Sequence, residues 1–86
     1  MPVTSTGVTV GTSITAVSGP TQNPKLVYLQ SGTAGALTYV GGDDVSAANG
    51  ILLSETNNAV FQTNADDTLY CISDTEGAVV KALEVQ

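Results

Sequence analysis

Clusters of glycine, proline, asparagine, aspartate and serine interrupt the chain about every eight to twelve residues. The stretches between them are rich in valine, threonine and other residues that favour β-strands, and strong helix formers are sparse. This spacing predicts an all-β fold, a small antiparallel sandwich or barrel of about seven short strands. The expected strands are residues 7–17, 25–30, 36–40, 51–54, 59–63, 68–73 and 78–85.

The first of these runs, GVTVGTSITAV at residues 7–17, alternates apolar and polar residues, which predicts a strand with one wet face. The loop SGPTQNP follows, so we expect an N-terminal strand or extended arm at 1–24 and a compact β domain at 25–86. An arm with an unpaired edge favours contacts outside its own domain. Its candidate protein-interface residues are Val3, Val8, Val10 and Ile14. Alternatively, residues 7–17 are the first strand of the same sandwich.

The last run, AVVKALEV, contains several good helix formers. Its length is short for a helix, and the turn sequence DTEG at residues 74–77 precedes it. We therefore expect residues 78–85 to form a strand, joined to the strand before it by a hairpin-like connection.

The stretch YVGGDDVSAANG is the one loop that invites a chemical interpretation. Asp43 and Asp44 are neighbours, so in an extended chain they point to opposite sides, and the stretch lacks the ligand spacing of a calcium loop. No lysine or long helix follows, as a phosphate-binding loop requires. We interpret the stretch as a turn with positive φ at Gly41 and Gly42, local hydrogen bonds from backbone amides to the carboxylates, and Val45 directed toward the core.

The chain is short for an independent fold, with 86 residues and a 42% hydrophobic composition that is largely alanine and valine. Small domains with thin cores usually add disulfides, a metal or oligomerisation. Cys71 is the only cysteine and histidine is absent, so neither an internal disulfide nor a structural zinc site is available. We therefore expect association with further copies or with a larger surface.

The charge is strongly negative, because eight carboxylates face only Lys25 and Lys81 and give a net charge of −6. Nucleic-acid binders need basic residues to displace counterions from phosphates, so no nucleic-acid partner is expected. Anionic membrane surfaces are disfavoured for the same reason. The N-terminal sequence has neither a positive charge nor a continuous apolar run, so we expect no signal peptide and synthesis in a cytoplasm.

Catalytic equipment is not apparent in the sequence. Without histidine, neither a Ser-His nor a Cys-His nucleophile pair is possible, and Cys71 lies in a strand-like run where a thiol is usually buried and inert. The three tyrosines lie in apolar runs and are expected to pack in a core or an interface. We therefore expect no enzyme, and we assign no catalytic, cofactor-binding or metal-binding residue.

Four segments of the sequence resemble a pattern found in short structural proteins of tailed bacteriophages. These segments are VYLQ, LTYVGGDDVSAANGILL, TLYCIS and GAVVKALEV, which together extend over about residues 26–85. They consist of turn and core residues rather than a chemical signature. The sequence departs from the pattern at Cys71, where alanine is expected, and in its acidic turns.

Such proteins include capsid decoration, or cement, proteins, which are small all-β units on the outside of the head, often trimers or dimers. The resemblance thus implies a virion protein on the outer capsid surface, with the major capsid protein as partner and a homo-oligomer, preferably a trimer. The alternatives are a head-fibre base or tail-associated module, or a soluble carbohydrate- or protein-binding β module. Against a sugar-binding module, the chain has no tryptophan and few aromatic residues.

Overall fold

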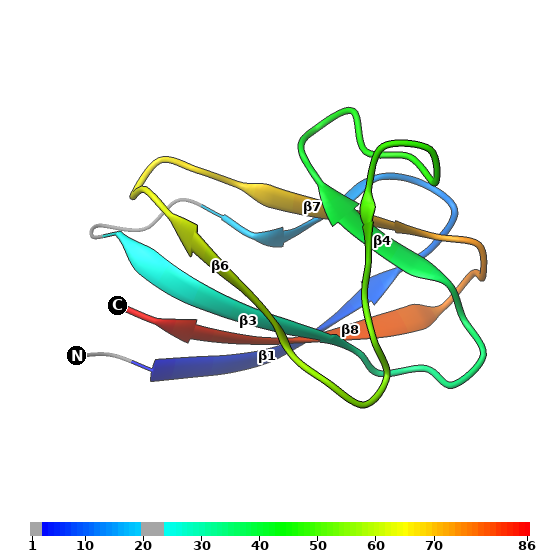
Figure 1. Ribbon diagram of the computed structural model, residues 1–86, viewed down its shortest axis with the longest axis horizontal. Coiled ribbons are helices and arrows are strands. Elements are labelled where there is room, and N and C mark those ends of the chain that lie inside the picture. Colours follow the sequence, from blue (N-terminus) through cyan, green and yellow to red (C-terminus); the bar gives the residue numbers. More distant parts are fainter. Residues whose placement is uncertain (1–2, 20–23) are drawn as a thin grey trace.

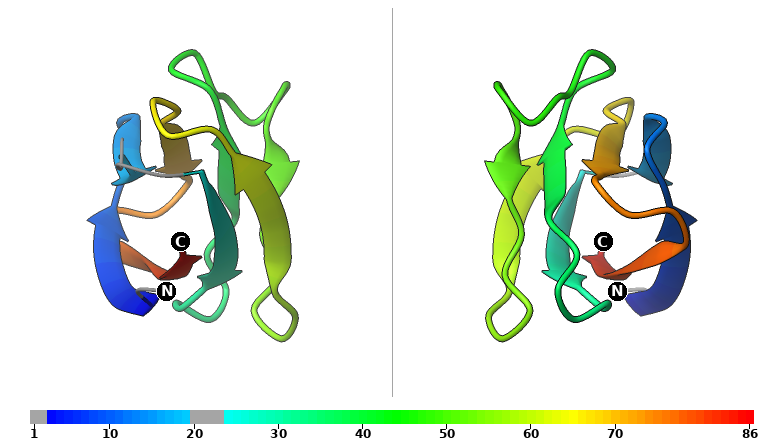
Figure 2. Two further views of the ribbon diagram at one scale, coloured as in Figure 1. Left: turned by 90° about the vertical axis from the view of Figure 1, so that its left-hand side faces the viewer. Right: turned by 90° about the vertical axis from the view of Figure 1, so that its right-hand side faces the viewer.

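The computed structural model describes residues 3–19 and 24–86 and forms a small β-sandwich of eight strands in two antiparallel sheets (Figure 1). The predicted all-β class and antiparallel sandwich are therefore confirmed. Viewed from either end, the sheet that contains β1 (Val3–Val10) and β6 (Ala59–Thr63) curves beneath the other sheet, with β1 at one side and β6 at the other (Figure 2). Among the described residues, no helix has the length and apolar character needed to cross a membrane.

Each sheet contains four strands, and neighbours in the sequence are rarely neighbours in a sheet. Sheet A has the order β1 (Val3–Val10), β8 (Ala78–Val85), β3 (Lys25–Ser31) and β6 (Ala59–Thr63). Sheet B has the order β2 (Thr15–Ser18), β7 (Leu69–Ser73), β4 (Thr38–Gly41) and β5 (Ile51–Leu52).

The predicted single strand at residues 7–17 is wrong, because the run divides into β1 of sheet A and β2 of sheet B. The chain crosses between the sheets after Val10, and the alternation changes phase on the way: Val10 and Val17 are buried, whereas Ala16 is exposed. The crossing is held by the Ser73 amide, which donates to the Gly11 carbonyl at 2.8 Å. Both strands belong to the same two sheets as residues 25–86, while 1–2 and 20–23 of the proposed arm lie outside the described residues.

The DTEG segment is also not a hairpin, although the predicted strand after it is confirmed as β8. Because β7 lies in sheet B and β8 in sheet A, the segment carries the chain across the sandwich, beside the β1–β2 crossing (Figure 1). Glu76 joins the two crossings by accepting hydrogen bonds from the hydroxyl and the amide of Thr12, which lower the pKa of its carboxyl. The strand then pairs with β1 and β3 on its two sides, so β8 is one of the two inner strands of sheet A.

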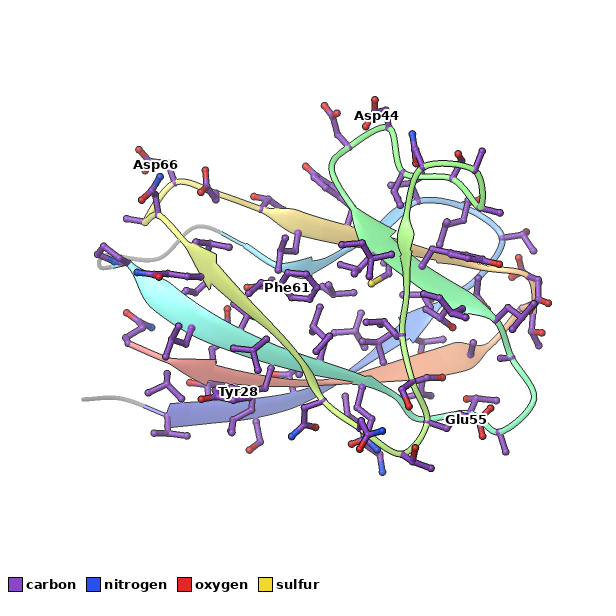
Figure 3. The ribbon with its side chains drawn as sticks, in the orientation of Figure 1. Tyr28, Asp44, Glu55, Phe61 and Asp66 are labelled. Carbon is purple, nitrogen blue, oxygen red and sulfur yellow. The ribbon has the colours of Figure 1, made fainter. Side chains whose placement is uncertain are left out.

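The core lies between the inner faces of the two sheets and consists mainly of small and β-branched residues. Leu29 is completely buried, and Phe61 extends into the space between the sheets (Figure 3). The other buried members of the cluster are Val10, Val17, Val27, Ala36, Val40, Leu53, Cys71, Ala78, Val80 and Ala82. One polar pair lies among them, since the Thr38 hydroxyl is 3.3 Å from the Ser73 hydroxyl. The sequence-based expectation of a core with few large side chains is consistent with this composition.

Candidate interaction surface

The loop between β4 and β5 is an exposed turn, as predicted, and it rises above sheet B in Figure 1. We expected its hydrogen bonds to involve the Asp43 and Asp44 carboxylates, but among the described residues they involve the Gly42 carbonyl and the Asn49 side chain instead. The Val45 amide donates to the Gly42 carbonyl at 3.1 Å, and the Asn49 side chain binds the Ser46 amide at 2.7 Å and the Asp44 carbonyl at 3.2 Å. Within residues 3–19 and 24–86, no group of three or more acidic, cysteine or histidine side chains is arranged to hold a metal ion.

The glycines of this loop provide space, not positive φ. Positive φ is found at Gly35 and Gly77 among the described residues, so its prediction at Gly41 and Gly42 is wrong. A Cβ on Gly41 would lie 2.9 Å from Val45 Cγ2, and one on Gly50 would lie 2.7 Å from Tyr39 Cβ. Val45 is buried as predicted, but it packs on these outward-facing positions of sheet B. The loop therefore covers part of the outer face of its own sheet.

We expect replacement of both Asp43 and Asp44 by Asn to change the free energy of unfolding by less than about 0.5 kcal/mol, as for an ordinary exposed site. The matched variant Asn49→Ala removes two hydrogen bonds from the same loop and should cost about 1–2 kcal/mol. Urea unfolding measures both values. EDTA should leave the melting temperature of the unmodified chain unchanged, and a clear decrease would mean that these carboxylates bind a cation.

Cys71 provides no nucleophile in the folded chain. It lies in β7 with no exposed surface, and burial raises the pKa of its thiol to about 12. The thiol is therefore protonated at neutral pH and inaccessible, which agrees with the expectation of an inert cysteine.

The four candidate interface residues do not form one surface. Val3 is exposed on the outer face of sheet A, whereas Val8 and Val10 point inward, Val10 into the core and Val8 packed against it. Ile14 is exposed between β1 and β2. The strand pairing explains this separation, because residues of opposite parity in β1 lie on opposite faces of the sheet.

The strand registers build an apolar surface on the outer face of sheet A. One row across the sheet joins Leu83, Tyr28 and Val60, and the next joins Val3, Val85 and Leu26. Val3, Leu26 and Val60 are exposed, and Tyr28, Leu83 and Val85 are half-buried. In Figure 3, Tyr28 projects from the lower side of β3, away from the core that contains Phe61. Exposed apolar side chains in two neighbouring rows make this face a candidate interaction surface.

A hollow of about 450 Å³ lies within this face. Tyr28, Gln30, Lys81 and Leu83 are among its lining residues, and Gly7 forms part of it. A Cβ on Gly7 would meet only Val79 Cγ1, at 3.8 Å, so the absence of a side chain leaves this space open. The residues that line the hollow are thus both apolar, such as Leu83, and polar or charged, such as Gln30 and Lys81.

The two lysines have different environments. Lys25 is buried, and its ammonium donates to the Gly19 carbonyl at 2.8 Å and the Asp67 carbonyl at 3.5 Å. Lys81 is exposed on the outer face of sheet A, and its side chain passes over Gly32. Lys81 is therefore the one exposed cation in a chain of two lysines.

Carboxylates avoid the outer face of sheet A. Of the eight acidic residues, only Glu84 lies in a strand, where it faces inward and accepts a hydrogen bond from the Ser18 hydroxyl. The others lie in loops, as Figure 3 illustrates for Asp44, Glu55 and Asp66. No acidic residue therefore occupies an outward-facing strand position of sheet A, although Glu55 lies next to Gln30 at its border.

The apolar outer face of sheet A was not predicted, although residues 25–30 contain a sequence signal for it. In KLVYLQ, apolar residues occupy both parities of the strand: Val27 and Leu29 point to the core, and Leu26 and Tyr28 point outward. Such a run is typical of a strand covered on both faces. The three tyrosines lie on outer faces: Tyr28 on sheet A, and Tyr39 and Tyr70 on sheet B.

Comparisons with known proteins add no relative: no family model, no curated protein and no solved structure matches the chain.

Proposed function

We propose that this chain is a structural protein of a tailed-bacteriophage virion that decorates and stabilises the outer surface of the capsid. It acts through protein–protein contacts and not as an enzyme. The observation that carries the proposal is the outer face of sheet A, which is apolar and free of carboxylates in a chain of net charge −6. The resemblance of residues 26–85 to short phage structural proteins supports the assignment to a virion.

The outer face of sheet A has the composition that docking requires. Burying an unpaired carboxylate in an interface is costly, and this face has none. Tyr28 and the aliphatic residues around it supply apolar area, and the hollow beside Lys81 accepts a protruding side chain. The expected partner surface is an apolar patch on the major capsid protein. Because Lys81 lies within the docking face, this patch should also carry a carboxylate or carbonyl that accepts a hydrogen bond from the Lys81 ammonium.

The position of the acidic loop between β4 and β5 is compatible with docking through the outer face of sheet A. With the outer face of sheet A against the capsid, the Asp43–Asp44 loop above sheet B points away from it (Figure 1). The negative charge then faces solvent instead of the packaged nucleic acid or the docking surface.

Copy number tests the proposal directly. We expect purified particles to contain the chain in hundreds of copies, as a decoration protein requires. A few copies per particle would indicate a head-fibre base or a tail-associated module, and absence from the particle would indicate a soluble binding module.

A matched pair of variants tests the docking face. Val60 and Leu52 are each 53% exposed and lie on edge strands of opposite sheets, Val60 on β6 and Leu52 on β5. Val60→Asp places a carboxylate in the outer face of sheet A and should weaken binding to undecorated heads by about tenfold to a hundredfold, a loss of about 1.4–2.8 kcal/mol. Leu52→Asp adds the same charge at equal exposure and should bind normally. Equal binding by both variants would exclude this face as the docking surface.

A further inference from the structure

Strand β1 has an open edge that is unusual in length and regularity. It pairs with β8 without a register break from Val3–Val85 to Val10–Ala78, and no described strand pairs with its other side. The other edges are shorter: β5 has two residues, β6 has five, and β2 has four with a register shift.

Nothing in β1 protects this edge from pairing. Natural sheets block their edges with charges, proline, bulges or very short strands. The sequence of β1, VTSTGVTV, contains no charge and no proline, and its register against β8 shows no bulge. Its backbone donors and acceptors on the open side are therefore available to a further strand.

We propose that β1 pairs antiparallel with β1 of a second copy, so that the two sheets A join into one continuous sheet. The contact is an isologous dimer, in which the same strand serves both partners and the assembly closes. This proposal concerns self-association and does not depend on docking to a capsid.

Symmetry limits the register of this pair. In an antiparallel ladder, two residues that face each other have their side chains on the same side of the sheet. A twofold axis between two residues would pair sequence neighbours, whose side chains lie on opposite sides, so the axis must pass through one residue, which then pairs with its own copy. An axis at Thr6 pairs Ser5 with Gly7, Thr4 with Val8 and Val3 with Thr9, all of them uncharged. An axis at Gly7 would instead draw the buried Val10 into the ladder and place glycine at the centre. The geometry points to Thr6.

Charge favours this edge contact over stacking of the two outer faces. Stacked faces would each present a lysine and no carboxylate to the other. In the joined sheet, the strand order β8-β1-β1-β8 separates the two Lys81 positions by at least three strand spacings, ~14 Å. This distance exceeds the Debye length of about 8 Å in physiological salt, so the repulsion is screened.

The joined sheet also leaves the outer faces of both copies on the same side. A twofold axis perpendicular to the sheet exchanges the copies without exchanging the faces. The dimer therefore presents two apolar surfaces side by side, and association does not cover them.

A single cysteine at the axis tests the pairing. Opposed Cα atoms in an antiparallel ladder are ~4.5–5.5 Å apart, within the range that a disulfide spans. Thr6 is exposed, and the native Cys71 is buried and does not compete. We expect sedimentation to show a concentration-dependent dimer of the unmodified chain. Thr6→Cys should give a covalent dimer under mild oxidation in native buffer, where Cys71 stays buried.

Two control variants fix the strand and the register. Gln62→Cys is exposed on β6, the opposite edge of the same sheet, and should remain monomeric on a non-reducing gel. Gly7→Cys lies one residue from the axis and on the other face, and it should cross-link poorly. A monomer at all concentrations, a trimer, or a dimer that cross-links through Gln62→Cys would overturn the proposal. A dimer that cross-links through Gly7→Cys and not Thr6→Cys would overturn the register.

Discussion

Deletion of residues 1–17 is expected to abolish cooperative folding. The deletion removes β1 and most of β2, and with them eight register pairs with β8 and two of the three pairs with β7. It also removes Val10 and Val17 from the core, each worth about 1.5–3 kcal/mol when buried. The deletion also exposes the inward-facing side chains of β8, which increases the loss of stability. Small domains have a free energy of unfolding of only about 5–15 kcal/mol in total.

Circular dichroism and urea unfolding measure the effect. The truncated chain should show no cooperative transition, and adding a peptide of residues 1–18 should restore one, because the peptide supplies both missing strands. A truncated chain that unfolds cooperatively near the midpoint of the full chain would show that residues 1–17 are an arm, as the sequence alone also allowed.

The second large effect is expected at Leu29. This side chain is completely buried in β3, between the two sheets, so Leu29→Ala should lower the free energy of unfolding by about 2–5 kcal/mol. Leu26 is the matched control, since it is the same residue type on the same strand but points outward and is 37% exposed. Leu26→Ala should cost less than about 1 kcal/mol.

Leu26→Ala should weaken binding to heads more than Leu29→Ala does, which is the reverse of their order in loss of stability. Leu26 belongs to the outer face of sheet A, so Leu26→Ala should weaken docking while the chain stays folded. The folded fraction of Leu29→Ala should dock normally, because its outer face is intact. Comparable losses of stability in urea would contradict the assignment of the two faces of β3.

Local residue chemistry was sufficient to predict the fold class and the position of most connections between strands. Breaker clusters such as residues 64–67 limit strand length, and threonine and valine between them favour extended backbone. The burial of Cys71 and Val45 followed from the same reasoning. These properties depend on a few neighbouring residues, which a single sequence contains.

The sheet to which each strand belongs could not be predicted, because it is fixed by contacts between distant residues. Gly11 to Ile14 continue an alternating pattern, so nothing nearby marks the change of sheet, and only the pairing with the distant strand β7, such as that of Thr15 with Cys71, places β2 in sheet B. The DTEG segment likewise has residues typical of a β-hairpin turn, but it connects β7 of sheet B with β8 of sheet A. The outer face of sheet A depends on these pairings. The interface residues proposed from the N-terminal segment are therefore separated, because Val3 lies on the outer face of sheet A whereas Val8 and Val10 face the core.

The pairing of Val3 with Val85 has a mechanical consequence. The start of β1 and the end of β8 therefore lie side by side at one end of the sandwich (Figure 1). Tension applied between them pulls across the β1–β8 ladder at its terminal pair, so the ladder opens one pair after another, like a zipper, and each step resists with few hydrogen bonds. A load that pulls β1 along the sheet must instead shear the whole ladder at once. The protein should therefore yield easily when it is stretched by its ends, and segments fused to either end should emerge at the same side of the sandwich.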